Sequence, residues 1–349
     1  MAGRKRERGS IDESDRGRLA GDENMTLRTR LTERLGIRHP ILLAPMGFAA
    51  GGKLAGAVSE AGGLGLIGGG YGDGPWIERE FTAAGNRRVG IGFITWSLAR
   101  NPGLLDAALA RHPAAVMLSF GDPAPFAPAI KAARALLICQ VQNAAQARAA
   151  LDCGADILVA QGTEAGGHGG ARATLPLVPA IVDLAAVRAP DAIVVAAGGI
   201  ADGRGLAAAL MLGAAGALIG TRFYASVESL AHEKAKARLA AASGEDTLRT
   251  ATVDIVRRLN WPREFSARVL RNDFVERWHG QEAALTAAVD QESERYRQAA
   301  ERGDFATAAV FGGEAADLVT DAPPAGEIVA RLIQEAEAAL REGAALLAP

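Results

Sequence analysis

Short apolar runs alternate with amphipathic stretches from about Leu35 to Tyr224. The apolar runs are almost continuously hydrophobic, which is typical of parallel strands that are buried on both faces. The amphipathic stretches between them have the spacing of helices, and Asn143, Gly154 and Gly213 supply cap or stop signals. We therefore expect eight strands, at Ile41–Ala44, Leu64–Ile67, Val89–Phe93, Ala115–Leu118, Leu136–Val141, Asp156–Ala160, Ile193–Ala197 and Ala217–Ile219.

Eight strand–helix units in succession predict a (β/α)8 TIM barrel of the α/β class. A doubly wound sheet is the alternative architecture. The glycines favour the barrel, because they follow many of the strands and not only the first. In a barrel, all of these glycine-rich strand ends would meet on one face.

The alternation stops after Tyr224. Residues 226–320 are rich in charge and are expected to form a helical insertion after strand eight, with no strand of its own. Insertions that follow barrel strands lie on the active-site face, so we expect this one to act as a lid. The apolar positions of Pro324–Leu347 predict a closing helix. The expected organisation is a disordered polar tail over 1–24, a barrel over 25–225, the insertion over 226–320 and the closing helix within 321–349.

The composition argues against several partners and locations. The 349 residues carry a formal net charge of −2, so we expect neither nucleic acid nor an anionic membrane as a partner. The chain has two cysteines, Cys139 and Cys153, a number that fits a reducing cytoplasm. No Cys/His cluster or carboxylate pair has the spacing of a metal site, and no apolar run has the length of a membrane span, so we expect no metal and no membrane anchor.

A glycine-rich segment follows the sixth expected strand. Five of the ten residues in Gln161–Gly170 are glycine, and His168 stands among them. Glycine lets the backbone approach a ligand closely, and histidine changes its charge near neutral pH. The segment therefore predicts the wall of a cofactor pocket beside a proton-handling group. A flexible turn with a surface histidine is the alternative interpretation.

The loops after strands seven and eight predict a phosphate site. Gly198 and Gly199 follow strand seven ahead of a helix that opens near Gly203, and Gly220 and Thr221 follow strand eight. In barrel enzymes these two loops and a helix N-terminus bind phosphate, because unpaired backbone N–H groups and the helix dipole favour an anion. Ordinary turn glycines are the alternative.

The ends of strands one, five and six predict a surface for a flat ring system. Ala44, Pro45 and Met46 offer an apolar edge after strand one. Gln140 and Gln161 carry amides that can bond the edge of a heteroaromatic ring without charge, although one of them could equally form a structural hydrogen bond. A ring, a phosphate and a histidine on one face outline a barrel that binds flavin mononucleotide (FMN).

With these features in place, the sequence resembles the nitronate monooxygenase family, formerly called 2-nitropropane dioxygenases. The resemblance covers about Thr32 to Leu340. The matching motifs are Ala44–Met46, Ala61–Gly65, Gly162–His168, Ala197–Gly203, Gly220–Phe223, Asn260–Pro262, Arg268–Asn272 and Gly312–Ala316.

The resemblance implies noncovalent FMN and the oxidation of alkyl nitronates, in some members also nitroalkanes, by O2 to a carbonyl compound and nitrite. By position, His168 is the implied catalytic residue, which either removes an α-proton or holds an ionised nitronate. A homodimer is compatible with the sequence. The implied phosphate contacts are Gly198, Gly199, Gly220 and Thr221, and the implied ring contacts are Ala44, Pro45, Met46, Gln140, Gln161, Gly166 and Gly167.

Three departures from the family pattern concern the substrate side. Many members have Asn at the end of strand three, where this chain reads Gly90-Ile91-Gly92-Phe93. The family often has Gln and Ser in the late motif, where this chain has Glu314 and Ala315. Phe48, Trp96 and Tyr224 are candidates to line an apolar substrate slot.

Two other functions compete with this interpretation. The motifs from strand two, strand six and strand seven are also similar to those of the FMN-dependent enoyl-acyl-carrier-protein reductases, which use NAD(P)H to reduce an enoyl thioester. A flavin-binding protein without turnover is the other alternative. The Trp261-Pro262 pair and the Arg268–Asn272 segment favour the monooxygenase.

Overall fold

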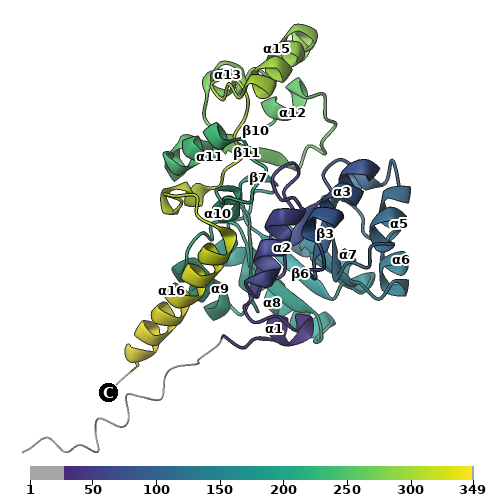
Figure 1. The fold of residues 1–349 in the computed structure, drawn as a ribbon, viewed down its shortest axis with the longest axis vertical. Helices are drawn as coiled ribbons and strands as arrows, with labels where there is room; N and C mark the ends of the chain where they lie inside the picture. Colours follow the sequence, from purple (N-terminus) through teal and green to yellow (C-terminus); the bar gives the residue numbers. More distant parts are fainter. Residues whose placement is uncertain (1–26, 348–349) are drawn as a thin grey trace, which may run out of the picture.

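The computed structural model describes residues 27–347, and its centre is a barrel of eight parallel strands (Figure 1). The strands are β1 (Ile41–Leu43), β2 (Leu66–Gly68), β3 (Gly90–Ile94), β4 (Ala115–Ser119), β5 (Leu136–Val141), β6 (Ile157–Gln161), β8 (Ile193–Ala197) and β9 (Ala217–Ile219). They follow the order β1-β9-β8-β6-β5-β4-β3-β2, and a bridge between Leu42 and Leu64 brings the two ends of the sheet together, so the barrel is nearly closed. The predicted fold class and all eight predicted strands are confirmed, while the tail predicted over residues 1–24 lies outside the described residues.

Side chains alternate between the inside and the outside of the barrel. Leu42, Met117 and Val159 are fully buried in the cluster that fills the interior. Their neighbours Leu43 and Leu118 point outward and pack under the surrounding helices. This alternation on a sheet buried on both sides explains why the strands are apolar at nearly every position.

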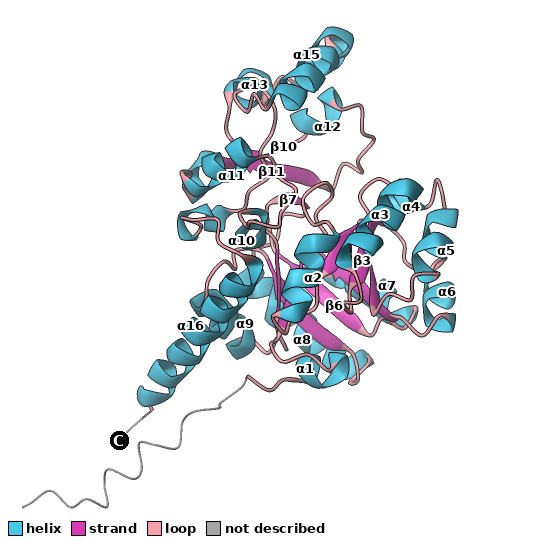
Figure 2. Ribbon diagram, viewed as in Figure 1, coloured by secondary structure: helices cyan, strands magenta, loops and turns pink. Residues whose placement is uncertain are grey.

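Helices surround the barrel, and one of them covers its amino-terminal end (Figure 2). The first of them, α1, covers the amino-terminal end, where Leu31 and Leu35 join the interior cluster. The last, α16, packs along α9 and α2 with Ile328, Leu332 and Ala336 buried. These helices are α1 (Arg30–Leu35), α2 (Gly52–Glu60), α3 (Gly74–Ala84), α4 (Thr95–Leu98), α5 (Gly103–Leu109), α6 (Ala127–Ala132), α7 (Ala144–Asp152), α8 (Thr174–Arg188), α9 (Gly203–Met211), α10 (Thr221–Tyr224) and α16 (Ala325–Ala345).

The insertion between α10 and α16 contains strands, so the prediction that it lacks them was wrong. Its strands β10 (Thr247–Thr250) and β11 (Ser266–Leu270) form an antiparallel sheet with β7 (Gly167–Gly169), in the order β10-β11-β7. The strands are short and carry arginines on one face, so their sequence pattern does not stand out from the charged helices around them. Because β7 belongs to the glycine-rich segment after β6, this sheet joins the insertion to the barrel face.

The remaining elements of the insertion pack around that small sheet. They are α11 (Glu233–Ala240), η2 (Gly244–Asp246), α12 (Thr252–Val256), α13 (Asp273–Trp278), α14 (Glu282–Ala287), α15 (Val289–Arg302) and η3 (Glu314–Leu318). Val253, Val269, Phe274 and Leu285 belong to a buried cluster of the insertion's own. The insertion lies beyond the carboxyl ends of the strands, at the top of Figure 1. None of the helices within residues 27–347 is both long and apolar enough to cross a bilayer.

Candidate active site

The carboxyl ends of the barrel strands and the insertion enclose one cavity. The barrel supplies its floor, and Arg257, Trp261 and Phe311 of the insertion line the opposite side. Every residue predicted as catalytic or cofactor-binding lines this cavity, namely Ala44, Pro45, Met46, Gln140, Gln161, Gly166, Gly167, His168, Gly198, Gly199, Gly220 and Thr221. The structure therefore brings together residues that lie up to 177 positions apart in the sequence, from Ala44 to Thr221.

His168 is paired with a buried carboxylate from the insertion. Its Nε2 lies 3.0 and 2.9 Å from the two carboxylate oxygens of Asp254 on α12. Both groups are shielded from solvent, with 9% of the His168 side chain and 6% of the Asp254 side chain exposed. The imidazole also stacks on Trp261, with ring centroids 3.4 Å apart and planes 4° apart. The ring is thus fixed in position and in orientation.

The surroundings of His168 favour a neutral imidazole with its proton on Nε2. Burial lowers the pKa of His168, while the hydrogen bond to Asp254 opposes that shift. A carboxylate can only accept here, so Nε2 carries the proton in the neutral tautomer. The other ring nitrogen, Nδ1, has no hydrogen-bond partner among residues 27–347. It is therefore the nitrogen that is free to accept a proton from a ligand in the cavity.

Gln161 holds the strand that carries His168. Its amide Nε2 donates to the backbone carbonyl of His168 at 3.1 Å. Its Oε1 accepts from Gln140 at 3.1 Å and from Gln142 at 2.9 Å. The amide of Gln161 thus makes structural hydrogen bonds, which was one of the two roles considered for Gln140 and Gln161. The backbone of His168 is also held by β11, where Ala267 is its strand partner.

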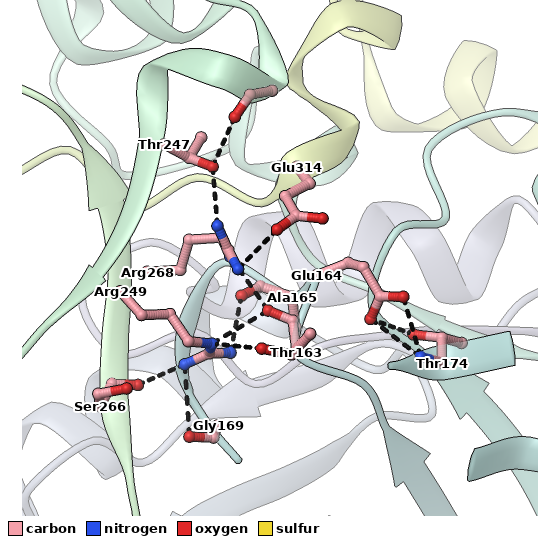
Figure 3. A network of polar contacts seen from close by, with 11 residues as sticks. Thr163, Glu164, Ala165, Gly169, Thr174, Thr247, Arg249, Ser266, Arg268 and Glu314 are labelled. Carbon is pink, nitrogen blue, oxygen red and sulfur yellow. Dashed lines mark hydrogen bonds and ion pairs between the residues drawn. The ribbon is translucent and has the colours of Figure 1, made fainter. Parts of the chain in front are cut away.

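Two arginines of the small sheet clamp the glycine-rich segment (Figure 3). Arg249 donates to the carbonyls of Thr163 and Ser266 at 3.1 and 2.5 Å. Arg268 donates to the same Thr163 carbonyl at 3.0 Å and pairs with Glu314 at 2.6 Å. Burial and the charge of Arg268 lower the pKa of Arg249 to about 10, which leaves it charged at neutral pH. The insertion therefore fixes the backbone on which His168 stands.

Glu164 fastens the same segment to the barrel. Its carboxylate accepts from the backbone N–H of Thr174 at 2.9 Å and from the Thr174 hydroxyl at 2.7 Å. Thr174 is the first residue of α8, so the negative charge also lies at the positive end of that helix. The Thr174 hydroxyl lies 3.0 Å from the carbonyl of Gly198, which links this segment to the loop after β8.

The loop after β8 has the backbone freedom expected of a phosphate cradle, and the loop after β9 adds a hydroxyl. Gly198 and Gly199 have φ angles of +98° and +73°, which side chains rarely adopt. Thr221 begins α10, and its hydroxyl accepts from the N–H of Gly313 at 3.0 Å. That bond leaves the hydroxyl proton of Thr221 for a ligand.

The helix N-terminus predicted to assist phosphate binding is already occupied by carboxylates. In the first turn of α9, the N–H of Gly203 donates to Glu335 at 2.8 Å and the N–H of Gly205 donates to Asp202 at 3.0 Å. Carboxylates of α16 and of the N-cap therefore take two of the N–H donors that the prediction assigned to phosphate. The cradle consists of the glycine loops and Thr221.

Aromatic side chains form the wall around His168. Tyr71, Phe120 and Phe311 line the cavity, and the Trp261 indole N–H donates to the Tyr71 hydroxyl at 3.0 Å. Of the three aromatic residues expected in a substrate slot, Phe48 and Tyr224 line the cavity. The third, Trp96, instead packs against Trp261, with ring centroids 5.4 Å apart.

A sequence model of the family described as nitronate monooxygenase matches residues 28–86 and 98–335. The chain belongs to the nitronate monooxygenase family. The resemblance inferred from the motifs is confirmed, and the chain is an oxidoreductase.

Two relatives are similar to this chain in sequence over most of their length. A nitronate monooxygenase from Neurospora crassa is 30% identical, over 87% of this chain and 91% of the relative. A 5-hydroxy-7a-methyl-1-oxo-octahydro-1H-indene-4-carboxyl-CoA dehydrogenase from Mycobacterium tuberculosis is 35% identical, over 78% of this chain and 75% of the relative. The similarity therefore extends over most of the chain in both comparisons.

Two solved structures share the fold over nearly the whole chain. FabK from Thermotoga maritima superposes with a TM-score of 0.80 and 31% identity, covering 92% of this chain and 99% of its own. A nitroalkane oxidase from Streptomyces ansochromogenes superposes with a TM-score of 0.75 and 28% identity, covering 90% and 99%.

The three departures from the family pattern have local physical causes or lie at the cavity. A side chain at Gly92 would collide with Pro45, because its Cβ would stand 2.3 Å from Pro45 Cγ. Glu314 forms the ion pair with Arg268. Ala315 lines the cavity, where a small residue leaves room for a ligand.

The sequence reasoning missed Asp254 and Arg257. Asp254 is the single carboxylate in the buried apolar run from Val253 to Val256, and that isolation is the signal that could have found it. Within residues 27–347 no group of three or more His, Cys, Asp or Glu side chains could hold a metal ion.

Proposed function

We propose that this chain uses FMN to oxidise alkyl nitronates, and nitroalkanes, with O2 to a carbonyl compound and nitrite. The observation that carries the proposal is the His168–Asp254 pair beside a glycine-lined cavity, in a chain of the nitronate monooxygenase family. The cavity would then hold FMN on the barrel side and the substrate on the insertion side.

The residues present fit FMN. Gly198 and Gly199 form a cradle whose positive φ angles exclude ordinary side chains, and Thr221 adds a hydroxyl donor. Ala44 to Met46 offer an apolar edge for the ring, with the Gln140 amide at a neighbouring strand end. When bound, FMN supplies two-electron redox chemistry.

His168 is suited to act as a general base toward a neutral nitroalkane. The α-carbon proton would pass to Nδ1, and the electron pair of the broken C–H bond would form the C=N bond of the nitronate. The resulting imidazolium would be stabilised by the Asp254 carboxylate that already bonds Nε2. A substrate supplied as its nitronate has already lost this proton, so His168 is not needed as a base.

A second candidate is the reduction of an enoyl thioester by FMN and NAD(P)H. The observation that favours it is the similarity to a carboxyl-CoA dehydrogenase, whose name specifies a thioester substrate. Both candidates would use the same flavin cradle and the same histidine.

Two measurements on the purified protein separate the candidates. Its absorbance spectrum reports bound flavin, and ethyl nitronate in air should then cause oxygen uptake with release of nitrite. Fast bleaching of the flavin by NADH without oxygen, together with no reaction of the nitronate, would instead support the thioester reductase.

The histidine has its own test. We expect His168→Ala to retain FMN, because the cradle and ring residues are unchanged, and to lose turnover of nitroethane. A fully active variant would remove His168 from the mechanism.

A further inference from the structure

Arg257 carries the only permanent charge among the described residues that line the cavity. Apart from it, His168 is the only titratable residue among the lining groups that has a charged form near neutral pH. Arg257 is half-buried, and its guanidinium carbon lies 5.6 Å from the ring centre of Tyr71 and 5.9 Å from that of Phe311. A cation in such aromatic surroundings is poorly solvated and favours an anionic partner.

No carboxylate of residues 27–347 fills that role. Arg257 forms no ion pair, and the nearby carboxylate of Asp254 is engaged by His168. The adjacent Arg258 differs, because it points outward and pairs with Asp290 on the surface. The chain thus holds one arginine at the cavity outside any ion pair of residues 27–347 and places the next in an ordinary surface pair.

Arg257 and Asp254 come from the same turn of helix. Asp254 lies within α12 and Arg257 is the residue that ends it, three positions later. Residues three apart lie on the same side of a helix. The apolar side of α12 is anchored in the core of the insertion by Val253 and Val256. One short helix therefore presents both the carboxylate that orients the base and a guanidinium that is in no ion pair with residues 27–347.

We propose that Arg257 binds the two oxygens of the nitronate group and so selects anionic substrates. A guanidinium presents parallel N–H donors that match a planar pair of oxygens, and a nitronate has the same planar arrangement as a carboxylate. With a neutral nitroalkane, the same oxygens gain negative charge only as His168 takes the α-proton. Arg257 then stabilises the developing anion rather than the ground state.

This inference rests on the proposed function, and Arg257→Met tests it with Arg258→Met as the matched control. Binding of nitrate, a planar unreactive oxyanion, to the FMN-loaded protein is measured by calorimetry. We expect Arg257→Met to weaken nitrate binding about tenfold or more, about 1.4 kcal/mol, and Arg258→Met to leave it unchanged. Arg257→Lys keeps the charge without the paired donors and should fall between the two.

Steady-state kinetics provide a second test of the role of Arg257. In Arg257→Met the KM for ethyl nitronate should rise about tenfold, while the KM for neutral nitroethane stays close to that of the parent protein and its kcat falls. No nitrate binding by the parent protein, unchanged nitrate binding in Arg257→Met, or an equal loss in Arg258→Met would overturn the proposal. If Arg257→Met does not fold, an Arg257→Lys variant with the affinity and KM of the parent overturns it equally.

The two proposals fail in distinguishable ways. Nitrate binding that depends on Arg257, in a protein that does not oxidise nitronates, would retain the anion site and reject the proposed function. Oxidation of nitronates with an unaltered KM in Arg257→Met would retain the proposed function and reject the anion site at Arg257.

Discussion

Asp254→Asn is expected to damage the reaction of neutral nitroalkanes selectively. The Asp254 side chain is 6% exposed, and both of its oxygens lie within 3.0 Å of His168 Nε2. A hydrogen bond to a charged group contributes about 1.5–3 kcal/mol, so losing about 2 kcal/mol when the imidazolium forms lowers kcat about 30-fold. The asparagine amide can also donate to Nε2, which would move the ring proton to Nδ1 and block the base. The loss is therefore expected to be about 30-fold or more.

A substrate that has already lost its proton provides the internal control. The kcat for nitroethane and the kcat for ethyl nitronate are measured on the same Asp254→Asn protein, with its FMN absorbance and its thermal unfolding compared with the parent. The nitronate rate should fall far less, because no proton passes to His168. Equal losses for the two substrates would refute the reasoning and would make Asp254 a structural residue only.

The pH dependence of the same reaction has a defined sign. Only neutral His168 accepts a proton, so kcat/KM for nitroethane should rise as the pH increases through the pKa of His168 and level off above it. Burial lowers that pKa, so the level region should extend below pH 6.5. Asp254 raises the pKa of His168, so Asp254→Asn should move the rising limb to still lower pH.

Two further predictions concern the cradle and the clamp. Gly199→Val should lose FMN during purification, because φ is +73° at this position and the added side chain would enter the cradle. The control Gly343→Val, at an open position of α16, should retain FMN. A Gly199→Val protein that remains yellow would show that the phosphate site lies elsewhere. Arg249→Met should lower the free energy of unfolding by about 2 kcal/mol, because several carbonyls lose their donor. Urea unfolding measures this against Arg295→Met, an exposed control expected to stay within about 0.5 kcal/mol; equal stabilities would show that the clamp contributes nothing.

The barrel could be predicted from the sequence because its signal is local. Each strand is buried on both faces, so runs such as Ile193–Ala197 are apolar at every position. The strands β10 and β11 lack that signal, because Arg249 and Arg268 face each other across the pair and interrupt their apolar residues. A charged face over four or five residues is indistinguishable from a solvated helix until its partners are known.

The part of the candidate site that could be predicted from the sequence is likewise the part with a local signal. His168 and the cradle glycines stand in dense local motifs, and their position at strand ends places them on one face. Asp254 lies 86 residues from His168 in the sequence, and nothing within its own segment indicates the partner. Arg257 and Arg258 are adjacent and identical in type, so only the structure shows which of them faces the cavity.

The division of the site between barrel and insertion has a consequence for substrate choice. The barrel residues at the cavity are mostly glycines and small apolar residues, which suit a cofactor held through its backbone contacts. Three of the groups that would distinguish one substrate from another, Arg257, Trp261 and Phe311, come from the insertion. The insertion is anchored to the barrel through β7 and the arginine clamp, so its side chains can vary without disturbing the cradle. We therefore expect that relatives named for nitronates and for carboxyl-CoA substrates differ mainly at the positions equivalent to these three residues, and that exchanging them changes KM before it changes FMN binding.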